Sequence, residues 1–516
     1  MIIRIDYPQP SVRLDLWGGT SGTFDGIDRF GRIIDQRWQN NTNTTPLDID
    51  RYEYGYDQDG NRLWKQNTVG SGFDESYTYD ALNQLTQMQR GTLNSGHTAV
   101  TGTPAKQQSW TLDPLGNWND FSTQTSGYTD LSQTRTHDKD NQITGFSSTP
   151  AWATPPGYDA AGNMTSFPKS DSPANAFTTT YDAWNRMKTV SDADGPMATY
   201  QYDGFGRRTI KTTAIETRHF YFTSSWQDIE ERVGTAATAD LQYMLGQRYI
   251  DELICRDDSS GNRLFVCQDA NFNLTCIADT SGTVQERYVY HPYGSKAIYS
   301  PTWQLRSTSS CNFEIGFQGI FTDPTTDLSF FRSRQYSSGL GIFLSRDSAH
   351  SSPNLYDFCL RNPIKNVDPS GNNSIPSSLW PLIALLGEEA VLTLLAALGA
   401  AALAALAAYG LLYLLRFIRC SKSLANCINN GLKQAKDCVE SGTNRDLSTL
   451  SKIGCQLTNQ IKFNASCEGA YAACMATWFG YFEQPEFDIN DCVMCEELDE
   501  FPDDLNKIPP CKPKEF

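Results

Sequence analysis

The chain has 516 residues, of which 39% are hydrophobic and 12% aromatic, and its formal net charge is −17. This length supplies ample material for a buried core, and the aromatic content excludes a chain that is disordered throughout. The acidic excess opposes binding to a phosphate backbone, which needs clustered Lys and Arg, so nucleic acid is not an expected partner.

The N-terminal segment, residues 1–23, carries no repeat and no apolar run of signal-peptide length. We expect it to be irregular. The export signal is therefore either unusual or lies in a longer chain of which this sequence is a part.

A Tyr-Asp pair followed by a turn-forming Asn or Gly recurs through residues 24–230, mostly at intervals of about 21 to 25 residues. The clearest copies are YDQDGNR, YDALNQL, YDAAGNM, YDAWNRM and YDGFGRR, which begin at Tyr56, Tyr79, Tyr158, Tyr181 and Tyr202. The Asp-x-x-Gly/Asn step suits a β-hairpin turn, and the flanks alternate apolar and polar residues. A single hairpin cannot bury its aromatic face, so the repeats predict one continuous, winding antiparallel sheet with stacked tyrosines. The alternative is a β-propeller, whose blades need about 40 to 50 residues each.

Residues 231–371 continue with "RYVYHPYGS" at 287–295 and "GFQGIFTDPTTDLSFFRSRQYSSGLGIFLSRDSAHSSPNLYDFCLRNPIKNVDPSG" at 316–371. The order of these motifs resembles the RHS repeat-associated core domain of the YD/RHS-repeat family, which includes bacterial polymorphic toxins, toxin-complex cocoon subunits and teneurins. The resemblance covers about residues 24–371. It implies a mainly β protein in which a spiralling antiparallel shell of repeats is closed by the core domain.

The resemblance also implies a self-cleavage site. In processed members of the family an Arg and two Asp residues cut the chain just after the final Asp-Pro-x-Gly, and the matching residues here are Arg334, Asp347 and Asp368. Two carboxylates held close together share a proton, so that one polarises the carbonyl while the other activates water. This aspartic autoproteolysis is the only enzymatic activity that we expect.

A structural role for the same residues stays open, in which both Asp residues cap turns and Arg334 pairs with one of them. The sequence departs from the processed members at three positions. Ser348 follows Asp347 where Pro is usual, Ile342 replaces an Arg, and Asn372 stands where Leu is frequent.

The composition changes after Gly371, and residues 372–390 are expected to be a linker. Residues 391–418 carry no charge before Arg416 and are long enough to cross a bilayer as a helix. A transmembrane span is therefore expected, with a buried or translocating helix as the alternative. The basic residues that follow would place the C-terminus in the cytoplasm.

The tail, residues 419–516, holds nine of the 14 cysteines, which indicates an oxidising compartment and conflicts with that orientation. A zinc site is disfavoured because the only closely paired cysteines are Cys492 and Cys495 and no His follows His350.

We expect a Cys-rich helical domain with helices near 421–440 and 453–478. Their antiparallel pairing predicts three disulfides, Cys438–Cys455, Cys427–Cys467 and Cys420–Cys474; the alternative is that these cysteines are small buried residues in a reduced helical pair.

Two functions follow from these features. The first is a membrane-associated, extracytoplasmic or cell-surface shell that displays or anchors its C-terminal domain, with a cell-surface protein or glycan as partner. The second is a toxin carrier that encloses residues 372–516 and releases them by self-cleavage. The tail lacks the His and the basic face of a nuclease, and neither function needs a cofactor, a metal or a small-molecule ligand.

Overall fold

The computed structural model describes residues 4–16, 26–42, 45–153, 155–170, 172–372 and 374–377. All of them belong to one compact unit. Within this unit each strand of the two long sheets pairs with its neighbour in sequence, so that both sheets are antiparallel meanders. The mainly β architecture that the sequence predicts is therefore confirmed for the described residues.

The first sheet has 11 strands. In order they are β1 (Arg4–Tyr7), β2 (Val12–Asp15), β3 (Asp35–Asn40), β4 (Leu47–Tyr56), β5 (Arg62–Asn67), β6 (Asp74–Tyr79), β7 (Leu85–Gly91), β8 (Lys106–Leu112), β9 (Trp118–Thr125), β10 (Tyr128–His137) and β11 (Ile143–Thr149).

The second sheet has 15 strands. They are β12 (Gly157–Tyr158), β13 (Met164–Pro168), β14 (Ala176–Tyr181), β15 (Met187–Asp192), β16 (Gly195–Tyr202), β17 (Arg208–Thr212), β18 (Thr217–Phe222), β19 (Asp228–Val233), β20 (Leu241–Leu245), β21 (Leu253–Asp258), β22 (Arg263–Gln268), β23 (Leu274–Ala278), β24 (Val284–Tyr290), β25 (Lys296–Tyr299) and β26 (Leu305–Arg306).

The turn aspartates explain why the repeat folds as a hairpin. Asp182 accepts the backbone N–H groups of Trp184 at 2.9 Å and Arg186 at 3.0 Å through one carboxylate oxygen. Its other oxygen accepts the Arg186 Nε–H at 2.7 Å. The backbone polar groups of the turn are thus satisfied by a side chain of the turn itself.

In several repeats the residue four positions after the turn Asp also links one repeat to the next. Arg186 donates from Nη1 to the backbone carbonyl of Asp203, in the following turn, at 3.2 Å. Where this residue is Asn, as at Asn163, its amide donates to its own Asp159 and to Asn185 of the following turn, both at 2.9 Å. The turns therefore form a hydrogen-bonded row along the sheet.

The repeat tyrosines make a second link, in the opposite direction. Tyr181 donates its hydroxyl to the carbonyl of Met164 at 2.9 Å, and Tyr202 donates to Met187 at 2.7 Å. In each case the acceptor lies at the start of a strand in the preceding repeat. The motif recurs because the tyrosine of one repeat provides a hydrogen bond to a backbone carbonyl of the repeat before it.

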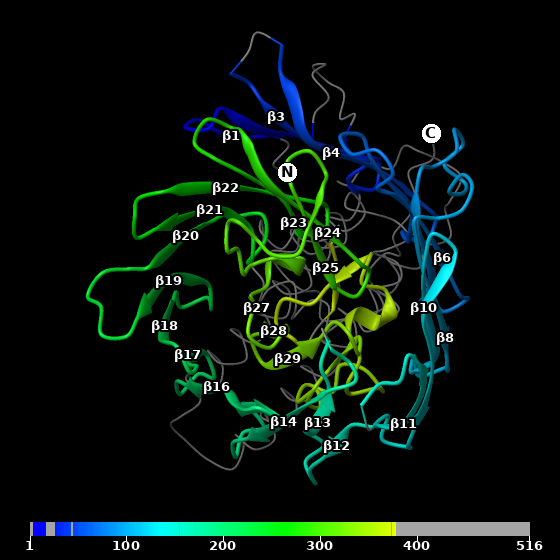
Figure 1. Ribbon diagram of the computed structural model, residues 1–516. Helices are drawn as coiled ribbons and strands as arrows, with labels where there is room; N and C mark the ends of the chain where they lie inside the picture. Colours follow the sequence, from blue (N-terminus) through cyan, green and yellow to red (C-terminus); the bar gives the residue numbers. More distant parts are fainter. Residues whose placement is uncertain are drawn as a thin grey trace, which may run out of the picture. The chain divides into compact units, whose positions relative to one another are not determined.

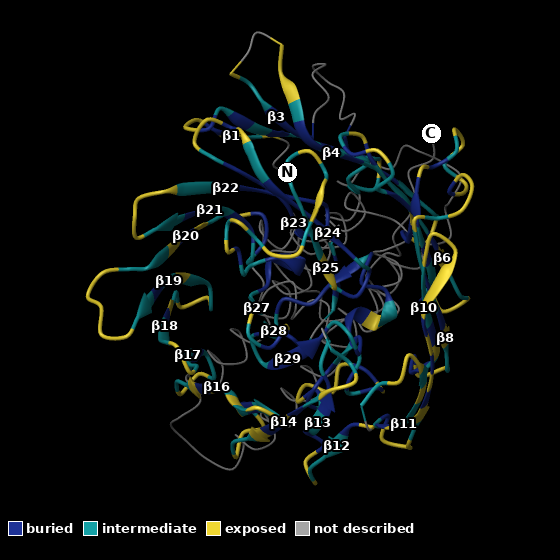
Figure 2. Ribbon diagram, viewed as in Figure 1, coloured by how far each residue is buried: buried dark blue, intermediate teal, exposed yellow. Residues whose placement is uncertain are grey.

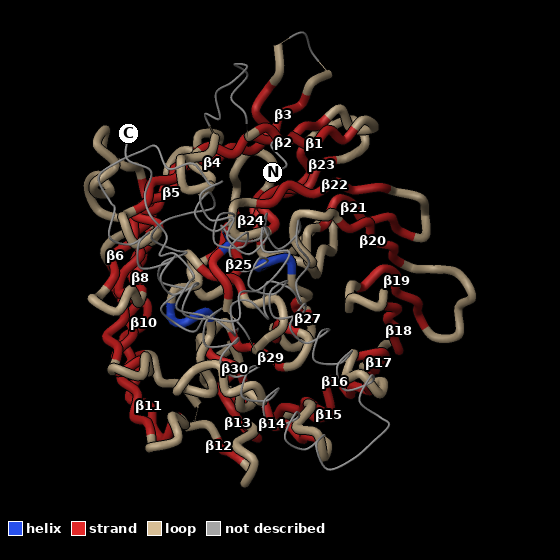
Figure 3. The backbone as a smooth tube through the Cα atoms, turned by 180° about the vertical axis from the view of Figure 1, so that it is seen from behind, coloured by secondary structure: helices blue, strands red, loops and turns tan. Residues whose placement is uncertain are grey.

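The core region adds a four-stranded sheet, β27 (Thr322–Asp323), β28 (Leu328–Phe331), β29 (Arg334–Ser337) and β30 (Ile342–Phe343), and a two-stranded one, β31 (Asn366–Val367) and β32 (Ile375–Pro376). Figures 1 and 3, which view the unit from opposite sides, show the four-stranded sheet inside the curve of the long sheets. Two 3-10 turns, η1 (Phe317–Gly319) and η2 (Cys359–Arg361), lie wholly within the described residues.

The inner sheet is held in place by an apolar core shared with both long sheets. One continuous cluster joins Tyr77 and Trp110 of the first sheet, Ile277 of the second, and Phe331 and Phe343 of the inner one. Figure 2 shows β28 and β29 mostly in the colour of buried residues, whereas exposed residues gather on the projecting turns. The two long sheets, β1 to β11 and β12 to β26, therefore form a wall, and the four-stranded sheet of the core region lies within it.

The structure corrects three details of the sequence-based prediction. The wall is two sheets rather than one, with a break between β11 and β12 where Pro150, Pro155 and Pro156 remove backbone donors. Residues 1–23 are not wholly irregular, because β1 and β2 extend the first sheet. The expected boundary at 230/231 does not interrupt the second sheet, which runs through β19. A propeller is excluded for this part of the chain, since no separate four-stranded blades surround an axis.

The C-terminal predictions lie largely outside the described residues. The expected linker, 372–390, starts with β32, which pairs with β31 instead of leaving the core. The apolar segment 391–418 and the Cys-rich tail 419–516, with its three expected disulfides, fall beyond residue 377. Over the ranges that the structure describes, no helix is long and apolar enough to span a membrane.

Candidate functional site

The segment 368–372 forms the bend between β31 and β32. Val367 lies opposite Ile375 and Asn366 opposite Pro376, so the chain leaves the Asp-Pro-Ser-Gly step and returns against the strand that preceded it. Gly371 has a φ of +73°, and a Cβ atom there would lie 2.3 Å from the carbonyl oxygen of Phe331. Only glycine fits this close approach, which explains the last residue of the motif.

Four successive carbonyl groups of this bend accept hydrogen bonds from side chains or backbone of the core region. The donors come from the turn before β29, from its first residue, and from the loop after β30. The bonds are Arg332 Nη1 to Pro369 O, Ser333 N (3.3 Å) and Oγ (2.6 Å) to Ser370 O, Arg334 Nε to Gly371 O, and Ser351 Oγ to Asn372 O (2.5 Å). Each of these carbonyl groups is therefore fixed by at least one hydrogen bond from the core region.

Arg334 lies at the centre of the site and is only 5% exposed. Its Nη1 donates to the carbonyl of Leu355 at 2.9 Å, and its guanidinium carbon lies 3.7 Å from the ring centre of Phe343. Burial lowers the pKa of Arg334 to about 10, against the opposing charges of Asp368, Asp347 and Asp357. Arg334 thus stays positively charged at neutral pH and interacts with both of the expected catalytic carboxylates.

Asp347 is 3% exposed and lies two residues beyond the Gly-Ile-Phe-Leu-Ser step that contains β30. It accepts the N–H of Ala349 at 2.7 Å on one oxygen, and the N–H and hydroxyl of Ser351 at 2.9 Å and 2.5 Å on the other. The side-chain amide of Asn372, turned so that its nitrogen meets acceptors, lies 3.2 Å from Asp347 Oδ1. Asp347 therefore caps a turn, and this turn contacts the bend through Asn372.

Asp368 is 1% exposed and begins the bend. Its backbone N–H donates to the Gln318 side-chain oxygen at 3.0 Å, and the Ser370 hydroxyl lies 3.5 Å from its Oδ1. The structure thus gathers Arg334, Asp347 and Asp368 around one segment. The separation of the two carboxylates, expected to be about 5 to 6 Å for a shared proton, stays a prediction.

Two residues of the site were missed from the sequence. Ser351 occupies the fourth position after Asp347, where the repeats carry Asn, Arg or Gln, and this spacing was the available signal. Asp357 lies near Arg334, and its ion pair with Arg361 measures 3.1 Å. Burial raises the pKa of Asp357. No sequence pattern marked it, because its role depends on a contact between distant segments.

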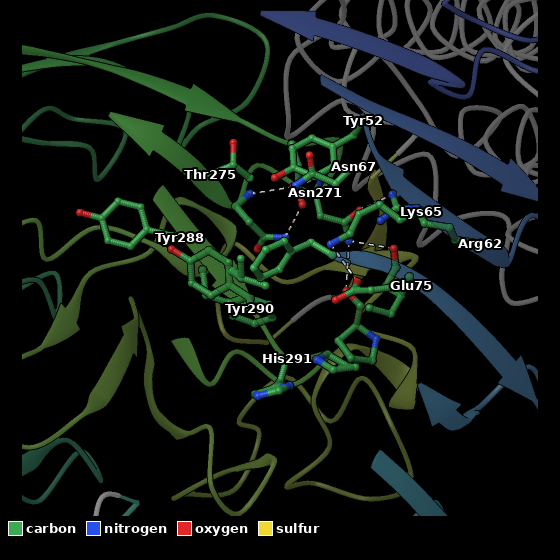
Figure 4. Close-up of a pocket in the computed structure, with 18 of the residues that line it drawn as sticks. Tyr52, Arg62, Lys65, Asn67, Glu75, Asn271, Thr275, Tyr288, Tyr290 and His291 are labelled. Carbon is green, nitrogen blue, oxygen red and sulfur yellow. Dashed lines mark hydrogen bonds and ion pairs between the residues drawn. The ribbon is translucent and has the colours of Figure 1, made fainter. Parts of the chain in front are cut away.

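A second polar region lies where the repeats meet the core region (Figure 4). It encloses a cavity of about 30 Å³ between Arg62, Lys65 and Glu75 on one side and Tyr290 and His291 on the other. Lys65 lies 2.8 Å from Glu75, which also pairs with Arg90. A cavity of this size holds one or two water molecules and no organic cofactor. Over the described ranges, no three His, Cys, Asp or Glu residues form a cluster able to hold a metal ion.

Comparison with known proteins agrees with this architecture. Residues 193–368 match the family model described as Teneurin YD-shell. The chain is 24% identical over 413 residues to the tRNA nuclease WapA of Bacillus subtilis, covering 71% of this chain and 16% of that protein. It is 24% identical over 195 residues to Teneurin-3 of Mus musculus, covering 35% of this chain and 7% of that one.

Solved structures share the fold. The Tc holotoxin pore of Photorhabdus luminescens gives a TM-score of 0.54 at 17% identity, covering 72% of this chain and 18% of that one. The TcdB2–TccC3 crystal structure gives 0.53 at 17% identity, covering 72% and 19%. The chain spans less than a fifth of the length of each of these relatives. The repeated turns, the inner sheet and these matches together show that the described part of the chain is similar to the YD-shell family in sequence and shares its fold.

Proposed function

We propose that this protein is a self-processing carrier that cuts its own chain at the bend after Asp368 and so separates the C-terminal segment from the shell. The observation that supports this proposal best is that four successive backbone carbonyls, from Pro369 to Asn372, each accept a hydrogen bond from a side chain of the core region. Fixing a peptide in one orientation is what hydrolysis requires of an enzyme.

The chemistry would follow the aspartic pattern. Asp347 and Asp368 are both buried beside Arg334, and one carboxyl would polarise the scissile carbonyl while the other takes a proton from water. Arg334, bonded to Gly371 O, would hold the substrate segment and stabilise the carboxylates. Each protein molecule would cut once, because the substrate is its own chain.

The relatives support a toxin-related or surface shell in an extracellular or cell-surface location. They do not supply the activity of the C-terminal segment. WapA is a tRNA nuclease, but this chain covers only 16% of it. No His follows His350 here, and the sequence from Glu483 to Asp504 is strongly acidic, neither of which suits a nuclease.

The display or anchoring role that the sequence first favoured remains a prediction. It depends on a cell-surface protein or glycan partner and on a membrane span at 391–418, which lies beyond the described residues. The geometry at 368–372 favours the carrier, since a display protein has no need to grip its own chain at this point.

Self-processing is tested by producing the full chain with a different tag at each end and following both tags on a blot over time. We expect a discrete C-terminal fragment beginning just after the bend, and its absence in Arg334→Ala. A matched control is Arg186→Ala, which removes an arginine that also holds a carboxylate and a backbone carbonyl, but in a repeat turn. A wild-type chain that stays intact while folded would refute the proposal.

A further inference from the structure

Two buried cysteines face each other across adjacent strands of the second sheet. Cys267 of β22 and Cys276 of β23 are direct partners in the antiparallel register, and they are 2% and 0% exposed. Both are thiols in the structure, which thus shows the reduced form of the pair. Burial and the neighbouring Cys276 thiol raise the pKa of Cys267.

The pairing of these strands meets the geometric requirement for a disulfide bond. Directly opposed residues of an antiparallel pair have Cα atoms about 4.5 or 5.5 Å apart, and a disulfide spans about 4.4 to 6.8 Å between Cα atoms. Their Cβ atoms lie about 4.5 to 5.5 Å apart, which is about one ångström more than a disulfide prefers. A small approach of the two strands is therefore enough to join the sulfur atoms.

A third cysteine on the same face of the sheet is placed less well. Cys255 of β21 lies opposite Phe265 of β22, two residues before Cys267. Cys255 is thus a diagonal neighbour of Cys267, and diagonal neighbours lie about 7 to 8 Å apart. Cysteines whose Cα atoms are more than about 7 Å apart cannot be bridged unless the backbone moves. The register therefore selects Cys276 as the partner of Cys267.

The hairpin formed by β22 and β23 lies where the two long sheets and the core region meet. Trp38 of β3, in the first sheet, donates from Nε1 to the backbone carbonyl of Gln268 at 3.0 Å. In the hairpin turn, the Asn271 amide donates to the carbonyls of Pro363 and Ile364 at 3.0 Å and 2.9 Å. Figures 1 and 3 both show β22 and β23 beside β3. A crosslink within this hairpin therefore stiffens the junction of all three parts.

We infer that Cys267 and Cys276 form a disulfide bond that secures this junction. The inference does not depend on the proposed self-processing. The reaction is thiol–disulfide exchange with a small disulfide such as oxidised glutathione. One protein thiolate forms a mixed disulfide and releases a small thiol, and the second thiolate then displaces the other. Each protein thiol gives up its proton, each released thiol takes one up, and two electrons pass to the small disulfide.

Burial decides when the bond forms and how long it lasts. The thiolate is the reacting species, and the raised pKa of Cys267 keeps this residue protonated in the folded chain. Exchange therefore takes place while the hairpin is still accessible, before the first sheet and the core region cover it. Once formed, the bond is shielded from reducing agents in solution. It forms outside the reducing cytosol, where disulfides persist.

Mass spectrometry of the full chain tests the bond directly. The chain is expressed in an oxidising compartment of the host and, in parallel, in a reducing cytosol, then unfolded in an alkylating agent and digested with trypsin. Residues 264–287 form one tryptic peptide that carries both cysteines, whereas Cys255 lies in the peptide 249–256. From the oxidised chain we expect peptide 264–287 without alkyl groups and lighter by two hydrogen atoms, with Cys255 alkylated. From the reduced chain all three cysteines should be alkylated.

Two alanine variants show whether the bond stabilises the fold. Cys276→Ala removes the bond, and Cys255→Ala, the matched control, removes an equally buried thiol from the same apolar cluster. In chains from the oxidising compartment, Cys276→Ala should melt a few degrees below Cys255→Ala, because the bond limits the freedom of the unfolded chain. In chains from the reducing cytosol the two variants should melt alike.

The outcomes separate the bond from its effect on the junction. Two alkyl groups on peptide 264–287 of the oxidised wild type, or a link from this peptide to 249–256 or to any other peptide, overturn the inference. An internal bond in this peptide, with the expected difference between the two variants, supports it. If the bond forms but the oxidised variants melt alike, the bond does not secure the junction.

Discussion

The turns of the repeats and the turn at Asp347 have similar hydrogen bonds, with a different residue at the fourth position. Asp182 and Asp347 each accept the N–H groups of the second and fourth residues that follow them. In both turns the side chain at the fourth position then reaches a backbone carbonyl further on. That side chain is Arg186 in the repeat and Ser351 in the candidate site.

The difference decides what each turn can do. Arg186 brings a permanent positive charge that neutralises Asp182, and the pKa of Asp182 is lowered even though burial opposes this. Ser351 is neutral, so the fourth position brings no positive charge to Asp347. The turn at Asp347 therefore differs from the turn at Asp182 in charge at its fourth position.

The largest expected effect is the loss of cleavage when the second carboxylate is removed. Asp368→Asn keeps the size of the side chain but cannot take a proton from water, so we expect cleavage to slow by about 10³-fold or more. The measurement is the blot of the doubly tagged chain. Asp182→Asn is the matched control in a repeat turn, and cleavage should continue at the wild-type rate. Unchanged processing in Asp368→Asn would return both aspartates to a purely structural role.

The next effect concerns the contact between the wall and the inner sheet. Asp323 of β27 is fully buried, lies 2.6 Å from Lys211 of β17, and accepts the Tyr200 hydroxyl at 2.8 Å. Asp323→Ala would leave the Lys211 ammonium buried without its anion, at a cost of about 3 to 5 kcal/mol of unfolding free energy. Urea denaturation measures this change.

An exposed pair between the same two regions gives the control for that experiment. Asp140 in a repeat turn lies 3.1 Å from Arg346 of the core region, and both side chains are well exposed to solvent. Asp140→Ala should cost no more than about 1 kcal/mol. If Asp323→Ala cost as little, the buried pair would not be what holds the wall to the inner sheet.

A smaller effect is expected on acidification, from the polar region between the repeats and the core region. Burial, with the nearby Arg90 and Lys106, lowers the pKa of His291 to about 3. The unfolded chain takes up this proton near pH 6.5, so its contribution to stability is complete above that pH and is lost as the pH falls toward 3. The loss should be about 1.4 kcal/mol per pH unit within this window.

His291→Gln tests this dependence. Urea denaturation between pH 6 and pH 4.5 should show a shallower decline in the variant than in the wild type, by about one proton. Glu75 should affect stability mainly at lower pH than this range, because Lys65 and Arg90 lower its pKa to about 2 in spite of its burial. Parallel declines in the two proteins would show that His291 is not kept neutral by the fold.

The sequence predicted the repeats well because their structure is local. The Asp residue, the Asn or Arg four positions later, and the tyrosine all act within one repeat or on the adjacent one, so spacing alone reveals them. The break after β11 was missed, although Pro150, Pro155 and Pro156 mark a stretch with few backbone donors. The correct strand order thus followed from the period, and the number of sheets did not.

The candidate site was predictable only in part. Resemblance to processed relatives pointed to Arg334, Asp347 and Asp368, and the structure places all three around the bend. The hydrogen bonds to the four carbonyls could not be predicted, because Arg334 and Gly371 are distant in sequence and come together only in the folded chain. Ser351 was foreseeable in principle, since it stands at the position after Asp347 that the repeats reserve for a linking side chain.

The smallest expected effect isolates that link between turns. Asn163 donates to its own Asp159 and to Asn185 of the next turn, whereas Asn262 donates only to its own Asp258, at 2.9 Å. Asn163 is buried and Asn262 is exposed. Asn163→Ala should therefore cost about 1 kcal/mol more than Asn262→Ala, which is the worth of one additional buried hydrogen bond. Both variants are best compared in the Asp368→Asn background, so that cleavage does not alter the denaturation curves. If the two alanine variants unfolded at the same urea concentration, the row of linked turns would add nothing to stability. The fourth position would then be free to vary, and a serine there would not distinguish the turn at Asp347 from the repeats.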